Sequence, residues 1–168
     1  MKNVFYCLII LFFLSPQPCF SEWVQFDEFS CGFDLPNPKA WTVQEDSLSG
    51  AYQLVLIYES GEYVFSLGVM RPTDKQLSVT DPDFQAGYKD SKEEQGQHVL
   101  SEGYIEQDGK KGYSLKTSGR GQGITFQGRE DIFAHNGYIQ AFGIFYYGDE
   151  DNGLEWIEPL LDSIEFYD

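Results

Sequence analysis

The residues of this chain that could do chemistry are one cysteine, two histidines and one run of acids. Cys31 is the only cysteine beyond residue 21, and His98 and His135 are the only histidines. A catalytic thiol needs a histidine close to it in space, and nothing in the spacing brings either histidine to Cys31. We therefore expect Cys31 to be a small buried apolar residue. Both histidines are expected to be ordinary surface residues.

Asp149, Glu150 and Asp151 are three consecutive acids, followed by Asn152 and Gly153. An EF-hand calcium loop needs oxygen ligands at positions one, three and five and glycine at position six. Counted from Asp149, the glycine falls one position too early, so we predict neither an EF-hand site nor any cofactor, and weak, irregular cation binding is an alternative. Acids ahead of an apolar segment are typical of a helix N-terminus. The alternative is an exposed loop whose three acids bind a basic protein partner.

The chain is strongly acidic, with a formal net charge of −16 at pH 7. Beyond residue 21, ten Lys and Arg oppose 27 Asp and Glu, which gives −17. Such a field repels phosphate backbones and anionic lipid surfaces, which excludes nucleic-acid binding. It attracts basic proteins and cations, although a net charge far from zero also serves solubility alone.

The first 21 residues have the three parts of a secretory signal peptide. A basic start, Met1–Asn3, precedes the apolar run Val4–Leu14, and the polar stretch Ser15–Ser21 follows. The apolar run is shorter than the roughly 20 residues that a membrane-spanning helix needs. We expect cleavage between Ser21 and Glu22, export to the periplasm or the extracellular space, and no stable membrane insertion afterwards. A lipid on Cys19 is the alternative, but Gln17 and Pro18 stand where a lipobox has small residues.

Residues 22–168 are expected to form one α+β domain, because no repeat or low-complexity linker divides them. A helix is predicted from Pro82, capped by Asp81 and stopped by Gly96, and a second one is predicted after Gly153, interrupted by Pro159. A largely antiparallel sheet of about seven strands, drawn from the nine strand-like segments, completes the domain. Strands are expected at 23–26, 32–35, 52–58, 63–70, 99–106, 112–117, 124–134 and 138–146, with a short strand at 165–167.

Two of these segments predict where the core lies. The strand at 138–146 is apolar on both faces, which is typical of a central strand covered on both sides. Trp41 and Phe142 are expected to be core residues. The strand before it alternates, so we expect an apolar face of Ile124, Phe126, Ile132 and Ala134 and a polar face of Thr125, Gln127, Arg129 and Asp131.

Two short signatures resemble PsbP-like and DcrB-like proteins. The segment Gly32–Pro36 followed by Trp41 is similar to the opening of that family, and Leu160–Phe166 is similar to its closing segment. The chain departs from the pattern in having two extra residues before Trp41, Ile164 in place of an aromatic residue, and Pro159 in the last helix. The resemblance implies an α/β/α sandwich around an antiparallel sheet, and exported bacterial members belong to the cell envelope. It also implies a non-catalytic binding or assembly module, with no catalytic residue to carry over.

The function expected from the sequence is therefore an exported, non-catalytic protein-binding or assembly module of the cell envelope. The alternative is an acidic inhibitor or immunity protein that neutralises a basic secreted or envelope-directed enzyme. A hydrolase would instead require a pocket in which His98 or His135 meets a carboxylate.

Overall fold

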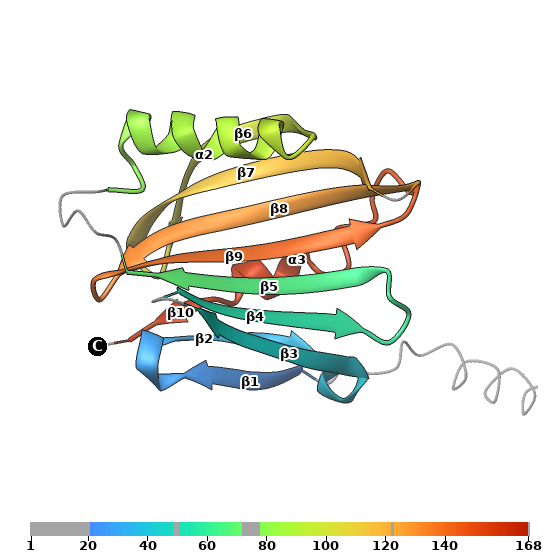
Figure 1. The fold of residues 1–168 in the computed structure, drawn as a ribbon. Coiled ribbons are helices and arrows are strands. Elements are labelled where there is room, and N and C mark those ends of the chain that lie inside the picture. Colours follow the sequence, from blue (N-terminus) through green and yellow to red (C-terminus); the bar gives the residue numbers. More distant parts are fainter. Residues whose placement is uncertain (1–20, 49–50, 72–77, 122, 168) are drawn as a thin grey trace, which may run out of the picture.

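The computed structural model describes residues 21–48, 51–71, 78–121 and 123–167, and places them in two antiparallel sheets (Figure 1). The larger sheet has seven strands in the order β3-β4-β5-β9-β8-β7-β6, and the smaller has three in the order β1-β2-β10. The strands of the larger sheet are β3 (Trp41–Leu48), β4 (Ala51–Tyr58), β5 (Tyr63–Met70), β6 (Gln97–Gln107), β7 (Lys110–Gly121), β8 (Ile124–His135) and β9 (Tyr138–Tyr147). Those of the smaller sheet are β1 (Ser21–Phe26), β2 (Cys31–Pro36) and β10 (Glu165–Phe166).

Different elements cover the two faces of the larger sheet. Helix α2 (Pro82–Glu94) lies on one face over β6 and β7, as Figure 1 shows. Helix α3 (Glu158–Asp162) and the smaller sheet pack on the other face. Two short 3-10 turns, η1 (Asp27–Phe29) and η2 (Pro38–Ala40), flank β2. The predicted α+β sandwich with a largely antiparallel sheet and two main helices is confirmed. The difference is that β1, β2 and β10 form a sheet of their own.

The main core lies between the larger sheet and the layer of α3 and the smaller sheet. β9 is the fourth of the seven strands, as its apolar faces predicted, and Phe142 on it is fully buried. Trp41 is 7% exposed. Both predicted core positions are therefore confirmed. Cys31 of β2 is also fully buried, and burial raises the pKa of its thiol to about 12.

Helix α2 begins and ends where the sequence predicted. The Asp81 side chain accepts a hydrogen bond from the backbone N–H of Asp83 at 2.8 Å, and Pro82 is the first helical residue. Its apolar stripe is thin, since Phe84 and Tyr88 are only partly buried against the second cluster of the core. The cluster's buried members are Val79, Tyr113, Leu115, Ile132 and Ile139.

Charged pairs add to the contact between α2 and the sheet. Lys92 Nζ lies 2.7 Å from Glu130 Oε1 on β8, and Tyr88 Oη donates to the other oxygen of Glu130 at 2.5 Å. Burial, and then the Glu130 carboxylate, raise the pKa of Tyr88. Nearer the sheet edge, Glu102 accepts hydrogen bonds from Tyr113 at 2.6 Å and Lys89 at 3.0 Å. These two hydrogen bonds lower the pKa of the Glu102 carboxyl.

The prediction for the two faces of β8 is wrong in part. Ile132 is buried as expected, but Ile124 is 53% exposed and Ala134 is also exposed. On the predicted polar face Asp131 is buried, because this half of the sheet is covered on both sides. The buried carboxylate is tolerated because Arg129, two residues away on the same face, pairs with it at 2.7 Å.

Candidate protein-binding surface

The three acids at positions 149–151 lie in a loop and not at a helix N-terminus. Asp151 to Ile157 form a series of turns, and α3 begins only at Glu158 with no side-chain cap. The helix-capping interpretation is therefore wrong, because Pro159 occupies the first turn of a short helix that starts well after the acids. All three acids are exposed. Within the described ranges, none of their carboxylates takes part in an ion pair.

Backbone contacts and two close-packed glycines hold this acidic loop in place. The side-chain amide of Gln127 on β8 donates to the backbone oxygen of Glu150 at 3.0 Å. Gly148 and Gly153, on either side of the acids, both pack against the ring of Tyr146, and a Cβ atom at either position would overlap that ring. The loop is thus folded over the end of β9, at the right of Figure 1.

Five aromatic residues gather beside the acidic loop and are called the aromatic cluster here. They come from β3, β4, β5, β9 and the turns before α3: Trp41, Tyr58, Tyr63, Tyr146 and Trp156. The Trp156 ring centroid lies 4.7 Å from that of Tyr63 and 5.0 Å from that of Tyr58. Trp156 is 38% exposed, whereas Trp41 and Tyr146 are the buried members of the cluster. A partner could therefore contact the exposed Trp156 ring, which packs on the other aromatic rings of the cluster.

Carboxylates lie near two tyrosines of the aromatic cluster. The pKa of Tyr146 is raised by burial and then by the negative charges of Glu150 and Glu62. The pKa of Tyr63 is raised by burial, and Tyr146, Glu62 and Glu150 add to the shift. Glu62 and Glu150 of the acidic loop therefore act on the same two rings. We call the aromatic cluster together with Glu62 and the acidic loop the aromatic–acidic surface.

The chemistry of this surface suits a cation. Aromatic faces attract ammonium and guanidinium groups through the ring quadrupole, and unpaired carboxylates beside them accept charge-assisted hydrogen bonds. Tyr63 and Tyr146 are neutral at physiological pH, since the ordinary tyrosine pKa is about 10 and the pKa of both is raised further. Tyr and Trp also supply a large contact area at a low cost in conformational entropy.

A hollow of about 330 Å³ lies beside the acidic loop. Asp151 and Glu155 of the loop region line it, as do Lys116 of β7 and Leu100 of β6. Glu155 faces this hollow, while the next residue, Trp156, belongs to the aromatic cluster. The loop region therefore borders two features that a partner could contact.

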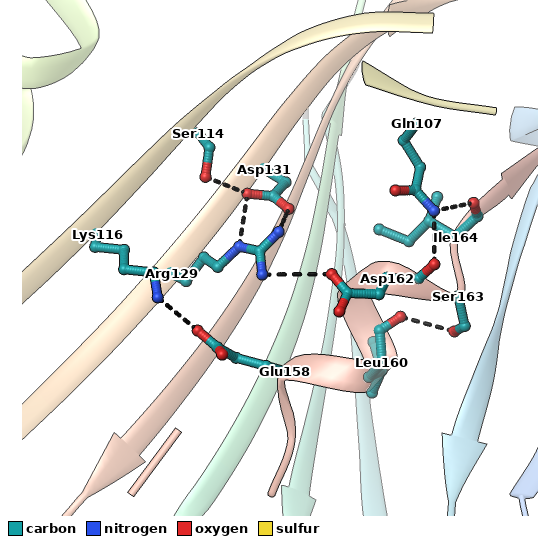
Figure 2. A network of polar contacts seen from close by, with 10 residues as sticks. All are labelled: Gln107, Ser114, Lys116, Arg129, Asp131, Glu158, Leu160, Asp162, Ser163 and Ile164. Carbon is teal, nitrogen blue, oxygen red and sulfur yellow. Dashed lines mark hydrogen bonds and ion pairs between the residues drawn. The ribbon is translucent and has the colours of Figure 1, made fainter. Parts of the chain in front are cut away.

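A polar network fastens α3 to the larger sheet (Figure 2). Arg129 pairs with Asp131 at 2.7 Å and reaches Asp162 of α3 at 3.4 Å. Ser114 Oγ donates to Asp131 at 2.5 Å, and Lys116 pairs with Glu158 at 2.7 Å. Burial opposes the charge on Arg129, but the hydrogen bond and charge of Asp131 outweigh it and raise the Arg129 pKa. Because its charges are paired with one another, this network is a structural element.

The side chain of Gln107 completes that network at the other end of α3. Its Nε2 donates to the backbone oxygens of Asp162 at 2.7 Å and Ile164 at 3.0 Å (Figure 2). These carbonyls follow the last helical turn, where no intrahelical N–H is left to pair with them.

The other candidate residues do not come together. His98 is exposed on β6, while His135 is buried, which corrects the expectation of a surface histidine. His135 lies at the end of β8, where its Nε2 is 3.0 Å from the backbone oxygen of Tyr167 and its ring packs on Phe166. Neither histidine contacts Cys31 or a carboxylate among the residues that the structure describes. Within the same residues, no three His, Cys, Asp or Glu side chains are grouped as metal ligands.

Sequence reasoning found the acidic loop but missed the aromatic cluster. Tyr58 and Tyr63 flank a predicted hairpin turn, so their proximity across the strands was available as a signal. Nothing local marked Trp156, because its exposure depends on turns that the helical spacing of Leu154, Ile157 and Leu161 concealed.

Comparison with known proteins finds similar folds but no similar sequence. No protein-family model matches the chain, and no curated protein matches it. The solution structure of cyanobacterial PsbP (CyanoP) from Synechocystis sp. PCC 6803 superposes with a TM-score of 0.65 and 16% identity, covering 91% of this chain and 98% of that one. The chain has a PsbP-like fold. This confirms the fold that the two sequence signatures implied.

Two further structures share the PsbP-like fold. The Ran-binding protein Mog1p of Saccharomyces cerevisiae has a TM-score of 0.57 and 10% identity, covering 89% of this chain and 97% of that one. LpqN of Mycobacterium tuberculosis, described as involved in cell envelope biogenesis, has a TM-score of 0.52 and 13% identity, covering 89% and 91%. Such identities establish a common fold and say nothing about a shared activity. None of the described helices is long and apolar enough to cross a membrane.

Proposed function

We propose that this chain is an exported, non-catalytic module that binds a basic protein partner through the aromatic–acidic surface. One observation carries the proposal. The partly exposed Trp156 ring packs against the rings of Trp41, Tyr58 and Tyr63. The carboxylates of Glu62 and Glu150, which have no ion-pair partner among the described residues, lie close enough to Tyr63 and Tyr146 to raise the pKa of both.

The loop has features of a built binding element. Gly148 and Gly153 pack on Tyr146, and Gln127 holds the backbone of Glu150, so the acids sit on a fixed base. Carboxylates that served solubility alone would not need to be held beside a cluster of aromatic side chains. The formal charge of −17 beyond residue 21 would also accelerate the encounter with a positive surface.

Export is part of the proposal and rests on the sequence of residues 1–21. A cut before Glu22 would remove only the first residue of β1. The mass of the protein recovered from outside the cytoplasm should therefore correspond to a chain that starts at Glu22. An intact Met1 or a lipid on Cys19 would contradict this.

The structural neighbours support a binding module by analogy only. Mog1p is described as a Ran-binding protein, and LpqN is described as involved in cell envelope biogenesis. Neutralisation of a basic enzyme is the second candidate function, since a basic enzyme would fit the same surface. Loss of the partner's catalytic activity on binding would favour that second function over an assembly role.

The proposal is tested by cross-linked capture from envelope extract with three forms of residues 22–168. The first is the wild type, and the second carries Asp149→Asn, Glu150→Gln and Asp151→Asn. The third is a control with the same change in charge: Asp90→Asn, Glu93→Gln and Glu94→Gln, all exposed on α2. We expect one partner that the wild type and the control retain and the loop variant loses. Equal capture by all three forms would contradict the proposal.

A further inference from the structure

Strand β6 is an edge strand of the larger sheet. Ten of its 11 residues pair with β7 on one side, and within the described part of the chain no strand pairs with its other side. An edge strand presents a row of backbone N–H and C=O groups that another extended chain can join.

Two large apolar side chains of β6 are exposed. Tyr104 is 67% exposed and Leu100 63%, the two highest values among the exposed large hydrophobic residues of the described chain. Proteins commonly protect such an edge with Lys or Pro, and β6 contains neither. The irregularity between Val99 and Ser101 shifts the register at Leu100.

Each of these two exposed side chains borders a hollow. Leu100 lines the hollow of about 330 Å³ beside the acidic loop. Tyr104 lines a second hollow of about 520 Å³ with Ile105, Glu106, Lys111 and Thr80. Since alternate side chains of a strand project to opposite faces, a chain added along β6 could place its own side chains in both hollows.

We propose that β6 binds an extended basic segment of the partner by strand addition. This inference rests on the proposed function, because the hollow at Leu100 is shared with Asp151 of the acidic loop. The added strand supplies backbone hydrogen bonds along β6, and its basic side chains meet the acids that line the hollow at that end.

The charges near β6 favour a basic segment as the added strand and disfavour a second copy of this chain. Lys89 pairs with Glu102, and Glu106 lies opposite Lys111 in the register. The hollow at Leu100, however, contains Asp151 and Glu155, which have no ion-pair partner among the described residues. Pairing two copies edge to edge would bring together two chains of formal charge −17, and like charges on adjacent strands are destabilising.

The test uses two synthetic peptide probes with capped ends. The first has about nine residues of alternating lysine and valine, enough to span most of a strand. The second has the same side chains, but every backbone nitrogen is methylated, so that it keeps the charge and cannot form a strand ladder. Binding to residues 22–168 is measured by fluorescence anisotropy at low salt, and hydrogen exchange locates the bound peptide.

We expect the first peptide to bind at least about tenfold more tightly than the second, because only the first can pair with β6. It should protect amides in 97–107. Leu100→Ser with Tyr104→Ser should weaken binding about tenfold by removing exposed apolar contacts. Val43→Ser, at a residue of β3 that is 56% exposed, should leave affinity unchanged.

Other results would overturn strand addition. These are equal affinities for the two peptides, no binding of either, protection confined to 148–157, or self-association of the protein through β6. Equal affinities with protection at 148–157 would still leave the aromatic–acidic surface as the binding site. Protection at 97–107, together with a native partner that is insensitive to the loop variant, would instead retain strand addition and reject the proposed function.

Discussion

The indole rings of Trp41 and Trp156 are stacked, with their centroids 6.4 Å apart and their planes inclined at 16°. Trp41 is a core residue whose Nε1 donates to the backbone oxygen of Pro36 at 2.6 Å, whereas Trp156 is 38% exposed. The buried ring thus supports the exposed ring. The two residues should therefore respond differently to truncation.

Trp41→Ala should lower the free energy of unfolding by about 3–5 kcal/mol, as is typical when a core aromatic residue is truncated. Trp156→Ala should lower it by much less, since its ring is partly in water, but should weaken partner binding about tenfold or more. Urea unfolding and a binding titration of each variant check this. The opposite pattern, with Trp156→Ala unfolding the protein and partner affinity intact, would make Trp156 a structural residue.

Gly153→Ala should displace the acidic loop, because a Cβ at this position overlaps the Tyr146 ring. Forcing atoms into a packed site costs about 1–3 kcal/mol, and the displaced acids should slow partner association. The matched control is Gly87→Ala in α2, where a Cβ meets nothing within 4 Å. That control should stabilise the protein by up to about 1 kcal/mol, because alanine favours helix over glycine. Similar unfolding midpoints for the two variants would refute the close packing.

Lys92→Met should be far more destabilising than Lys89→Met. The Lys92 and Glu130 side chains are only 13% and 9% exposed, and removing one partner of a buried pair costs about 3–5 kcal/mol. The pair of Lys89 and Glu102 is much more exposed, and such pairs contribute about 0–1 kcal/mol. Adding Glu130→Gln to Lys92→Met should restore part of the loss, and a double-mutant cycle measures the coupling. Simple additivity would show that the pair is not coupled.

Cys31 should resist thiol reagents in the native protein and react fully in urea. Burial raises the pKa of its thiol from an ordinary value of 9.0 to about 12. Above pH 9 the unfolded chain therefore loses this proton while the native chain keeps it, so this group lowers stability as pH rises towards 12. Labelling with iodoacetamide at pH 8, with and without urea, tests the burial. Rapid native labelling would contradict it.

The sequence predicted the elements that are marked by their own residues, through helix caps or the pattern of apolar side chains. Asp81, Pro82 and Gly96 marked α2, and the two apolar faces of β9 marked a central strand. The start of α3 was not predictable in this way. The spacing of apolar residues from Leu154 onward predicted a helix, but the chain forms turns up to Ile157 and α3 begins only at Glu158.

Polar residues at buried positions were the second source of error. Asp131 and His135 have polar side chains, yet both are buried. Asp131 is paired with Arg129 on the same face of β8, and the His135 ring is hydrogen-bonded to the backbone oxygen of Tyr167, which is distant in sequence. Similarly, the acidic loop was visible in the sequence, but the ring of Tyr146 beneath it was not. A surface built from five separate elements can be recognised only after the fold has assembled it.

The most direct test of the central claim is the association rate constant of the captured partner, measured at low and at physiological salt. For the wild type the rate should fall as salt rises, since exposed charges are screened beyond about 8 Å at physiological ionic strength. The loop variant Asp149→Asn, Glu150→Gln and Asp151→Asn should associate about tenfold more slowly at low salt. The α2 variant with the same net charge should associate like the wild type. Equal rates for the loop and α2 variants, with folding intact, would show that overall charge and not the aromatic–acidic surface guides binding.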